Sequence, residues 1–441
     1  MVQLTGWYRW RSSLLRGLIG TAMVGFLTAT TGLSAQTLPL PPLPPEQVVQ
    51  DVPPPKEEGA APAPLEPVPQ PRPRLWEYSL GAGVGWDGNI EFAKPDGPSG
   101  VVFAPRGDVA RVFWSPRGQL RAVVGSRWAG YPGEDGLNRY YGGIGLEGEY
   151  RSGSHTTWKG DASYLLGHTD SAIILLQQGV ALPQLKTRSV VSHVSLTQQV
   201  ARRTSLIIDG RFYRIDFDSP LLAKGDASSI RGDLALLQQL GARSTGSIVY
   251  ALEDVLVSAF NRRYSNHFAS LRWTRLLTLR SAILLEGGVS YTPDAAQVGL
   301  RQRDSFFGGA TYSRKVGASA TTLFVRREVI PAFGYGISQL QTSAGLRVEA
   351  PLGLHWRLGV DGSHTQPDNV SESALAGRPP FSDARLLLAR RLGKVLEVSA
   401  ETRYRRRGVT SLLGRISSFQ AGLYLSFTPP GGAKLPPGGL F

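Results

Sequence analysis

Arginine and carboxylate side chains are the residues of this sequence whose types and spacing point most directly to chemistry. Many stand two residues apart, as Glu147 and Glu149 do, and Arg403 and Arg405. Residues two apart share one face of a β-strand. An arginine fork binds a carboxylate or phosphate through two parallel hydrogen bonds. The spacing therefore predicts charged strand faces that brace themselves through Arg–carboxylate pairs or also bind anions, and the residues leave both readings open.

Histidine and cysteine offer little catalytic chemistry. The sequence contains no cysteine, which excludes disulfides, a thiol nucleophile and a Cys-ligated metal or iron–sulfur site. Neither a G-x-S-x-G nor an H-E-x-x-H motif is present. By alternation, His193 belongs on the same face as the charged residues and His267 on the opposite one. The histidines occur on separate segments, at His155, His168, His193, His267, His355 and His364. We expect no enzymatic activity, no cofactor and no metal site.

The segments that carry these charges alternate with a period of two residues. In the segment 355–361, Trp356, Leu358 and Val360 alternate with Arg357 and Asp361. Such alternation is the signature of a β-strand with one apolar and one polar face. Mean hydropathy is only −0.11, and the 41% of hydrophobic residues form no long apolar run after residue 75. Repeated segments of about ten residues with this pattern are typical of a transmembrane β-barrel.

The pattern predicts an all-β fold, an antiparallel transmembrane barrel of about 18 strands. Long connections alternate with short ones, as extracellular loops and periplasmic turns do in outer-membrane barrels; the connection 260–262 is the exception. No repeated blade motif suggests a propeller, and a soluble sandwich rarely sustains such long strands. The predicted strands are 75–86, 107–114, 118–128, 139–151, 155–167, 187–200, 203–217, 228–240, 245–259, 263–275, 280–292, 302–314, 318–330, 337–349, 353–365, 381–392, 394–407 and 415–427.

Aromatic residues recur at the ends of these segments, where they would form girdles at the two membrane interfaces. They are Trp76, Trp114, Trp128, Tyr140, Tyr150, Trp158 and Trp273.

Alternation places one set of charged residues toward the lumen. The candidates are Arg121, Arg127, Arg231, Arg272, Arg326, Arg347, Arg357, Arg385, Arg403, Arg405, Glu147, Glu149, Asp161, Asp361, Glu397 and Glu401, together with Asp233, Glu286, Glu328, Glu349 and Asp383. The formal net charge of +14 comes largely from arginine. Part of this charge could contact lipopolysaccharide phosphates instead of lining the lumen.

The residues outside the barrel region 75–427 divide into three segments. Residues 1–35 combine Arg9, Arg11 and Arg16 with a short apolar stretch and the small-residue exit before residue 36, which predicts a secretory signal peptide. Residues 36–74 hold 14 of the 31 prolines. Proline fixes φ and lacks a backbone donor, so we expect a periplasmic linker without helix or sheet, which could dock a periplasmic protein. Residues 428–441 are expected to form a flexible tail.

The last predicted strand resembles the terminal signal that the outer-membrane barrel-assembly machinery recognises. That signal combines a polar residue, a glycine, a hydrophobic residue and an aromatic residue, here Gln420, Gly422, Leu425 and Phe427. It usually ends the chain, whereas residues 428–441 follow it here. The resemblance implies the barrel-assembly machinery as a partner.

The first predicted strand and its turn resemble the opening of the β-barrel porin type 2 family. Residues 75–90 read LWEYSLGAGVGWDGNI, an aromatic and glycine-rich strand that continues into an Asp-x-Asn-Ile turn. The resemblance implies an outer-membrane porin and, through relatives in exopolysaccharide gene clusters, polysaccharide export. By themselves, Asp87 and Asn89 indicate an Asx turn rather than a calcium site. The glycines of the strand lack the following helix that a phosphate-binding loop needs.

These features together predict a conduit in the outer membrane of a Gram-negative-type bacterium. Export of an exopolysaccharide is the first hypothesis. A general diffusion porin with anion preference and a structural barrel that anchors a periplasmic interaction arm are the alternatives. The expected partners are outer-membrane lipid and lipopolysaccharide, the barrel-assembly machinery, an anionic polysaccharide or solute, and a periplasmic protein bound through the linker. Secretion removes nucleic acid from this list.

Overall fold

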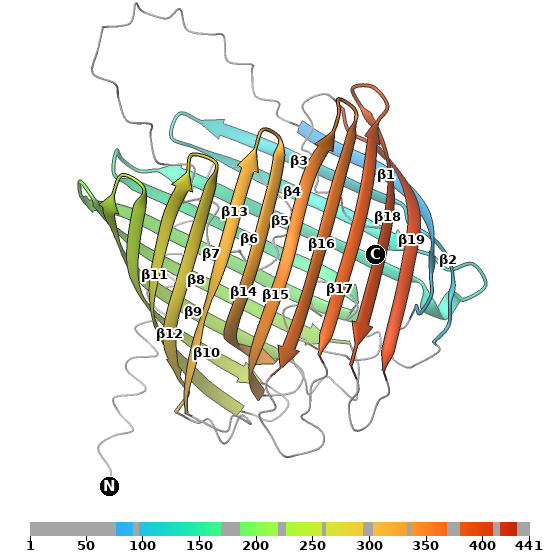
Figure 1. The fold of residues 1–441 in the computed structure, drawn as a ribbon. Coiled ribbons are helices and arrows are strands. Elements are labelled where there is room, and N and C mark those ends of the chain that lie inside the picture. The colour runs from blue at the N-terminus through green and yellow to red at the C-terminus, as the bar shows by residue number, and fades with distance from the viewer. Residues whose placement is uncertain are drawn as a thin grey trace, which may run out of the picture.

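The computed structural model forms one antiparallel barrel, and every neighbouring strand pair is connected by a ladder of backbone hydrogen bonds (Figure 1). The structure describes residues 76–90, 97–168, 186–218, 226–257, 262–293, 303–332, 337–367, 380–408 and 415–429. The expected signal peptide, the linker, most of the tail and the connection 169–185 lie outside the described residues.

The strands follow one another around the barrel in chain order, and their bounds agree closely with the alternating segments of the sequence. They are β1 Trp76–Asp87, β2 Gly100–Phe103, β3 Arg106–Ser115, β4 Gly118–Ala129, β5 Arg139–Arg151, β6 Thr156–His168, β7 Lys186–Ala201, β8 Thr204–Phe217, β9 Ala227–Gly241, β10 Ser244–Val257, β11 Arg262–Thr278, β12 Ser281–Tyr291, β13 Asp304–Val316, β14 Ser319–Ala332, β15 Ile337–Leu352, β16 Trp356–Pro367, β17 Phe381–Arg391, β18 Leu396–Arg407 and β19 Ile416–Phe427. A single 3-10 turn, η1, covers Asp135–Leu137.

Strands β2 and β3 share one position in the barrel, so the 19 strands occupy 18 positions around it. β2 pairs with the second half of β1, and β3 pairs with the first half. The ladder continues between them, because the amide and carbonyl of Ala104 bond Gly83 at 2.8 and 3.1 Å. Pro105 follows, and it has no N–H to continue the ladder. The expected count of about 18 is therefore confirmed, whereas the short segment 100–103 was not predicted.

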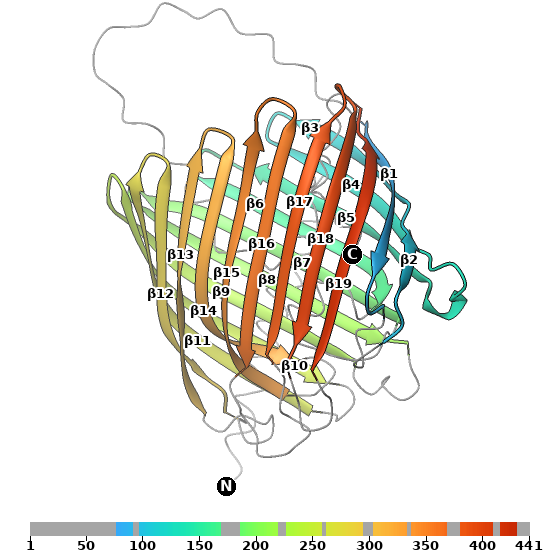
Figure 2. The same cartoon turned by 45° about the vertical axis from the view of Figure 1, so that its right-hand side comes forward.

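The strand ends that short turns join lie at one rim of the barrel, and the strand ends on either side of the long connections lie at the other, as Figures 1 and 2 show. We call the end with the short turns the short-turn rim. Gly317, Gly353 and Gly393 stand in three of these turns with φ of 60°, 78° and 94°. This left-handed region is one that side chains with a Cβ rarely adopt. Glycine at these positions therefore lets the chain reverse within a few residues.

The barrel closes where β1 meets β19, along the register from Leu80–Phe427 to Asp87–Gln420. Asp87 is fully buried there and accepts hydrogen bonds from Ser418 Oγ (3.1 Å) and Gln420 Nε2 (2.8 Å). The backbone N–H of Asn89 donates to Asp87 Oδ1 at 3.1 Å. The Asx turn expected from the sequence is thus confirmed, and its aspartate also fastens the first strand to the last.

The same seam explains a glycine in β1. A Cβ added to Gly81 would collide with the phenol ring of Tyr424 from β19. Arg106 of β3 lies over that ring, with its guanidinium carbon 4.5 Å from the centroid. An aromatic side chain from the last strand therefore occupies the space that glycine leaves on the first. On the outer face, Tyr78 and Phe427 stack at 6.3 Å.

The outer surface of the barrel is apolar. Large side chains such as Ile144, Ile248 and Leu271 are between 57% and 64% exposed, although they stand in the middle of regular strands. A surface of this extent and composition fits hydrocarbon and not water. In lipid every backbone N–H and C=O must be bonded internally, which a closed sheet achieves. The chain is thus a transmembrane antiparallel β-barrel. Among the described residues, no helix is long and apolar enough to cross a membrane.

Most of the predicted interface aromatics lie on this outer surface, but Trp114 does not. Trp114 pairs with Gln119 on the interior face of β3 and β4. Its neighbour Phe113 is the residue that faces outward, in register with Leu120. The sequence misled here because Phe113 and Trp114 are adjacent aromatics, and only one of two adjacent residues can face the lipid.

Candidate functional site: the charged lumen wall

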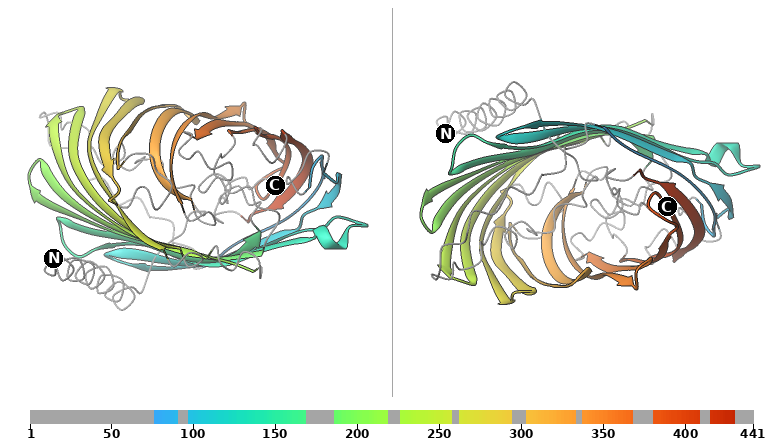
Figure 3. Two further views of the ribbon diagram at one scale, coloured as in Figure 1. Left: turned by 90° about the horizontal axis from the view of Figure 1, so that it is seen from below. Right: turned by 90° about the horizontal axis from the view of Figure 1, so that it is seen from above.

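The interior face of the barrel is the candidate site, and strand register decides which residues belong to it. Directly paired residues share a face, so the exposed apolar side chains identify the outer set and their chain neighbours the inner one. By this criterion the structure places all 16 sequence-predicted lumen residues on the interior face. Whether they line a conducting pathway is a separate matter of function. Viewed along its axis, the barrel is elongated in cross-section rather than round (Figure 3).

Two rows of polar residues run from strand to strand along this interior face. The first row follows consecutive register pairs through Arg121, Glu147, Asp161, His193, Arg211, Arg231, Glu253 and Asn266. The second row contains Arg347, Asp361, Arg385, Arg403, Gln420 and Asp87, and ends at the seam. Side chains directly opposite each other have Cβ atoms about 5 Å apart. Each row therefore brings charged groups from many strands within reach of one another.

Most of the predicted arginines in the wall are already paired with a carboxylate. At least eight of the ten lie within ion-pair distance of one: Arg121–Glu77 (2.7 Å), Arg231–Asp233 (2.8 Å), Arg272–Glu286 (2.8 Å), Arg326–Glu328 (3.4 Å), Arg347–Asp361 (2.7 Å), Arg357–Glu397 (2.9 Å), Arg385–Glu401 (2.7 Å) and Arg403–Asp383 (2.5 Å). Of the other two, Arg127 lies over the ring of Tyr141 at 5.1 Å, and Arg405 is 2% exposed. The geometry is that of a braced wall.

Some braces span more than one strand boundary. Arg121 of β4 reaches Glu77 of β1 across β3, and Arg357 of β16 reaches Glu397 of β18 across β17. Such a contact joins strands that share no backbone hydrogen bond. A long, planar guanidinium suits this role because it can donate in several directions from one rigid group.

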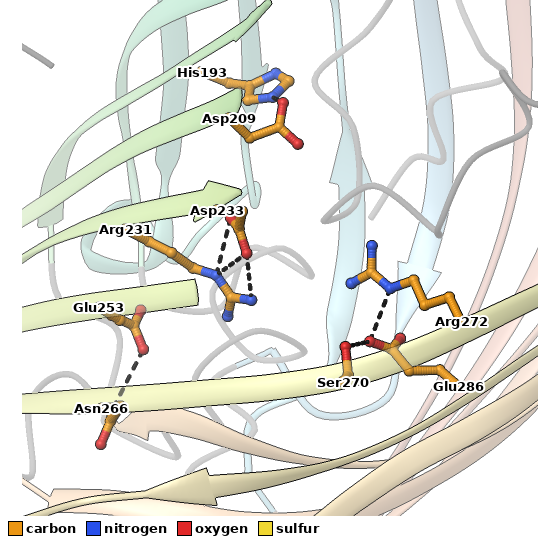
Figure 4. Close-up of polar contacts among 9 residues, drawn as sticks. All are labelled: His193, Asp209, Arg231, Asp233, Glu253, Asn266, Ser270, Arg272 and Glu286. Atoms are coloured by element: carbon orange, nitrogen blue, oxygen red, sulfur yellow. Dashed lines mark hydrogen bonds and ion pairs between the residues drawn. The ribbon is translucent and has the colours of Figure 1, made fainter. Parts of the chain in front are cut away.

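The wall around His193 is one of the most polar parts of the first row (Figure 4). Its Nδ1 lies 3.3 Å from Asp161 Oδ1, and its Nε2 lies 3.3 Å from Asp209 Oδ1. Only an imidazolium donates from both ring nitrogens. Two carboxylates on neighbouring strands therefore favour the protonated ring, which would act as a further cation in the row. His267 is on the outer face as expected, with Nδ1 2.9 Å from the hydroxyl of Tyr250.

Further along the same wall, Figure 4 shows three more bonded groups. Arg231 binds Asp233 two residues along β9, with Nη2 2.8 Å from Oδ1. Asn266 donates to Glu253 at 3.3 Å. Ser270 and Arg272 both donate to Glu286, at 2.9 and 2.8 Å.

Several members of these groups were not predicted, among them Glu77, Asp209, Arg211, Glu253 and Asn266. The period of two was present in β8, where Asp209 and Arg211 share one face with Ile207 and Tyr213. This face mixes apolar and charged residues, so alternation of hydrophobicity alone did not identify it. Within the described residues, no cluster of three or more histidine, aspartate or glutamate side chains could hold a metal ion.

One apolar cluster of the interior lies near the end with the long connections. Phe268 of β11 packs with Ala251 of β10 and Val329 of β14, and all three are nearly inaccessible. Phe307 packs against this cluster and meets Phe268 edge to face at 5.8 Å. This patch interrupts the charged wall on one side of the lumen.

Comparison with known proteins adds little to this description. No protein-family model matches the chain, and no curated protein sequence matches it. The resemblance of residues 75–90 to the β-barrel porin type 2 family therefore stays a prediction. Among solved structures, the siderophore receptor PirA from Acinetobacter baumannii is similar at 6% identity and a TM-score of 0.44, over 81% of each chain.

Two further structures are similar over 80% of this chain. OpdO from Pseudomonas aeruginosa has 15% identity and a TM-score of 0.43, with 96% of that chain covered. A bacterial polysaccharide outer membrane secretin has 10% identity and a TM-score of 0.34, with 98% covered. These similarities are weak, and the barrel is defined by its own hydrogen-bonded registers.

Proposed function

We propose that this protein is an outer-membrane channel whose lumen conducts an anionic polysaccharide. The observation that supports the channel role is the combination of an apolar exterior with a charged interior in a closed barrel with 18 strand positions. A barrel of this size leaves an aqueous lumen unless loops fold into it. A wall of paired arginines and carboxylates would remain hydrated and would resist collapse.

The polysaccharide cargo is supported by the resemblance of residues 75–90 and by the chemistry of the wall. A sugar polymer offers many hydroxyl groups to a surface of charged donors and acceptors. Carboxylate or phosphate substituents on the polymer would exchange with the carboxylates of the braces for arginine. No cofactor or metal is part of this proposal.

A second candidate is a general diffusion porin with anion preference, which the overall positive charge favours. The two differ in what they select. A diffusion porin would discriminate by size and charge alone, whereas a polysaccharide conduit would pass a linear oligosaccharide that is longer than a globular solute of the same mass. The third hypothesis, a barrel that anchors a periplasmic arm, concerns residues outside the described part of the chain.

Reconstitution of the chain without residues 1–35 tests the channel role. We expect stable conductance steps in planar bilayers, with anions more permeant than cations, and efflux of a linear oligouronate from loaded vesicles. Complete electrical silence together with no efflux would contradict the channel. Conductance with efflux of small anions but not of the oligouronate would favour the diffusion porin.

A further inference from the structure

The short-turn rim carries a concentration of positive charge that the lumen wall does not. Six basic residues stand within the turns themselves, namely Arg117, Arg202, Arg203, Arg243, Arg280 and Lys394, and we call them the basic collar. All six are exposed. The eight short turns, each of which lies within the described residues, contain no aspartate or glutamate.

Unlike the wall arginines, the collar is not neutralised by carboxylates. The structure shows no ion pair for any of its six members among the described residues. The opposite rim differs already in sequence: in the long connections, acidic residues outnumber basic ones. The barrel is therefore polarised along its axis, and the positive end is the one with the short turns.

The positive charge continues from the collar into the lumen opening. Lys315 near the end of β13 and Arg391 at the end of β17 are exposed and lie on the interior face. Arg391 is directly opposite Glu397, but that carboxylate already accepts a hydrogen bond from Arg357 at 2.9 Å. Two further cations therefore stand on the path from the turns to the wall, beside the carboxylates of Glu149 and Glu349 at the same ends of β5 and β15.

The residues next to these two provide a natural contrast. Arg314 and Arg390 precede Lys315 and Arg391 directly and, by alternation, lie on the outer face. Arg390 lies over the ring of Trp356, 5.2 Å from its centroid. An arginine stacked on an outward tryptophan is typical of the membrane interface, where lipid headgroups are its neighbours. Interior and exterior cations at this rim can therefore be removed separately.

We propose that the basic collar captures an anionic polysaccharide at the short-turn rim and directs it into the lumen, so that transport starts from that side. This inference rests on the proposed channel function. A ring of exposed cations around an aqueous opening raises the local concentration of anions and their rate of arrival. A single small anion gains little from exposed point charges, whereas a polymer with repeated carboxylates contacts several members at once.

Side-dependent block of the channel tests the collar. The full barrel is inserted into a planar bilayer at about 0.1 M salt, where charges act over about 10 Å. A linear oligogalacturonate, or a neutral dextran of the same length, is added to one side at a time. Because the chain has no cysteine, a Gly153→Cys variant labelled with a membrane-impermeant thiol reagent reports which side carries the short turns. Nothing lies within 4 Å of a Cβ at this position.

We expect the oligogalacturonate to interrupt the current about three- to tenfold more often from the short-turn side than from the other, and dextran to show no such asymmetry. Raising the salt to about 1 M should abolish the difference, because charges are then screened within about 3 Å. Equal interruption from both sides, or equal interruption by dextran, would overturn the proposal and leave the channel function intact.

Matched double variants locate the effect. Lys315→Gln with Arg391→Gln should lower the frequency of interruption from the short-turn side severalfold, whereas Arg314→Gln with Arg390→Gln should leave it unchanged. If the outer pair has the same effect as the inner pair, the charge serves lipid headgroups and the proposal fails. Stronger block by polyglutamate than by oligogalacturonate would assign the collar to an acidic protein and also overturn it. A chain that conducts no current at all would contradict the proposed function first.

Discussion

The lumen wall and the short-turn rim contain the same types of basic side chain, but in the described part of the chain these are paired in the wall and unpaired at the rim. In the wall, Arg403 and Asp383 are 6% and 11% exposed and bonded to each other, with Nε 2.9 Å from Oδ1. At the rim, Arg202 and Arg203 project from a turn with no carboxylate beside them. Strand geometry explains the difference. A residue within a sheet has neighbours at fixed positions on both sides, whereas a residue in a two-residue turn has none.

The positive charge that is available to a ligand lies at the rim rather than in the wall. Arginine is abundant in both regions, yet in the wall most arginines are paired with carboxylates and so hold strands together. A braced pair presents little net charge to a passing anion, since each guanidinium is matched by a carboxylate. The unpaired charge is at the rim, so attraction and bracing are separated along the axis of the barrel.

Removing one member of a wall brace should have the largest effect on stability. Asp383→Ala removes the carboxylate to which Arg403 donates while the guanidinium stays buried, and removing one member of a buried pair typically costs about 3–5 kcal/mol. Urea unfolding of the refolded barrel in lipid vesicles, followed by tryptophan fluorescence, measures this loss.

Asp254→Ala is the matched control for this variant. It removes the partner of Arg263 on the outer face, where that arginine side chain is 44% exposed. Exposed pairs contribute about 0–1 kcal/mol. Similar losses for the two variants would contradict the conclusion that burial distinguishes the wall from its surroundings.

A substitution at the seam should have an intermediate effect. Gly81→Val places two methyl groups where the ring of Tyr424 lies, and overpacking of this kind costs about 1–3 kcal/mol. The same unfolding assay applies. Gly287→Val is the control, because a Cβ at Gly287 meets nothing within 4 Å. A Gly81→Val barrel as stable as the original would show that the ring can move away at no cost.

Neutralising the rim should change stability least and selectivity most. Arg202→Gln, Arg203→Gln and Arg243→Gln combined should shift the free energy of unfolding by no more than about 0.5 kcal/mol per site, as is usual for exposed positions. The preference for anions, measured as the reversal potential in a salt gradient, should decrease. Unchanged selectivity in this variant would mean that the wall, despite its pairing, determines which ions pass.

Much of the fold could be predicted from alternation alone. The strand from residue 139 to 151 and the strand that starts at residue 118 were predicted with these bounds, because one apolar face against lipid and one polar face against water leave a period of two in the sequence. The segment 100–103 was missed because four residues are too few to display a period. Trp114 was placed on the wrong face because Phe113, its neighbour, fits the outer face equally well in composition.

The candidate site was predicted as a set of residues and not as a set of contacts. Alternation assigned Arg357 and Glu397 to the interior, but they stand 40 residues apart and on strands that are not neighbours. Asp87 was recognised as a turn residue, whereas its bonds to Ser418 and Gln420 depend on the register with which the barrel closes.

The sequence by itself therefore determined that this chain forms a barrel, where most of its strands lie and which face of most strands points inward, because these properties follow from local periodicity. Only the tertiary structure decided which charges neutralise one another, how the last strand meets the first and where positive charge is left over. Those outcomes depend on register between strands distant in sequence. A shift of one residue in a single ladder would reverse the faces of a strand and exchange all of its partners.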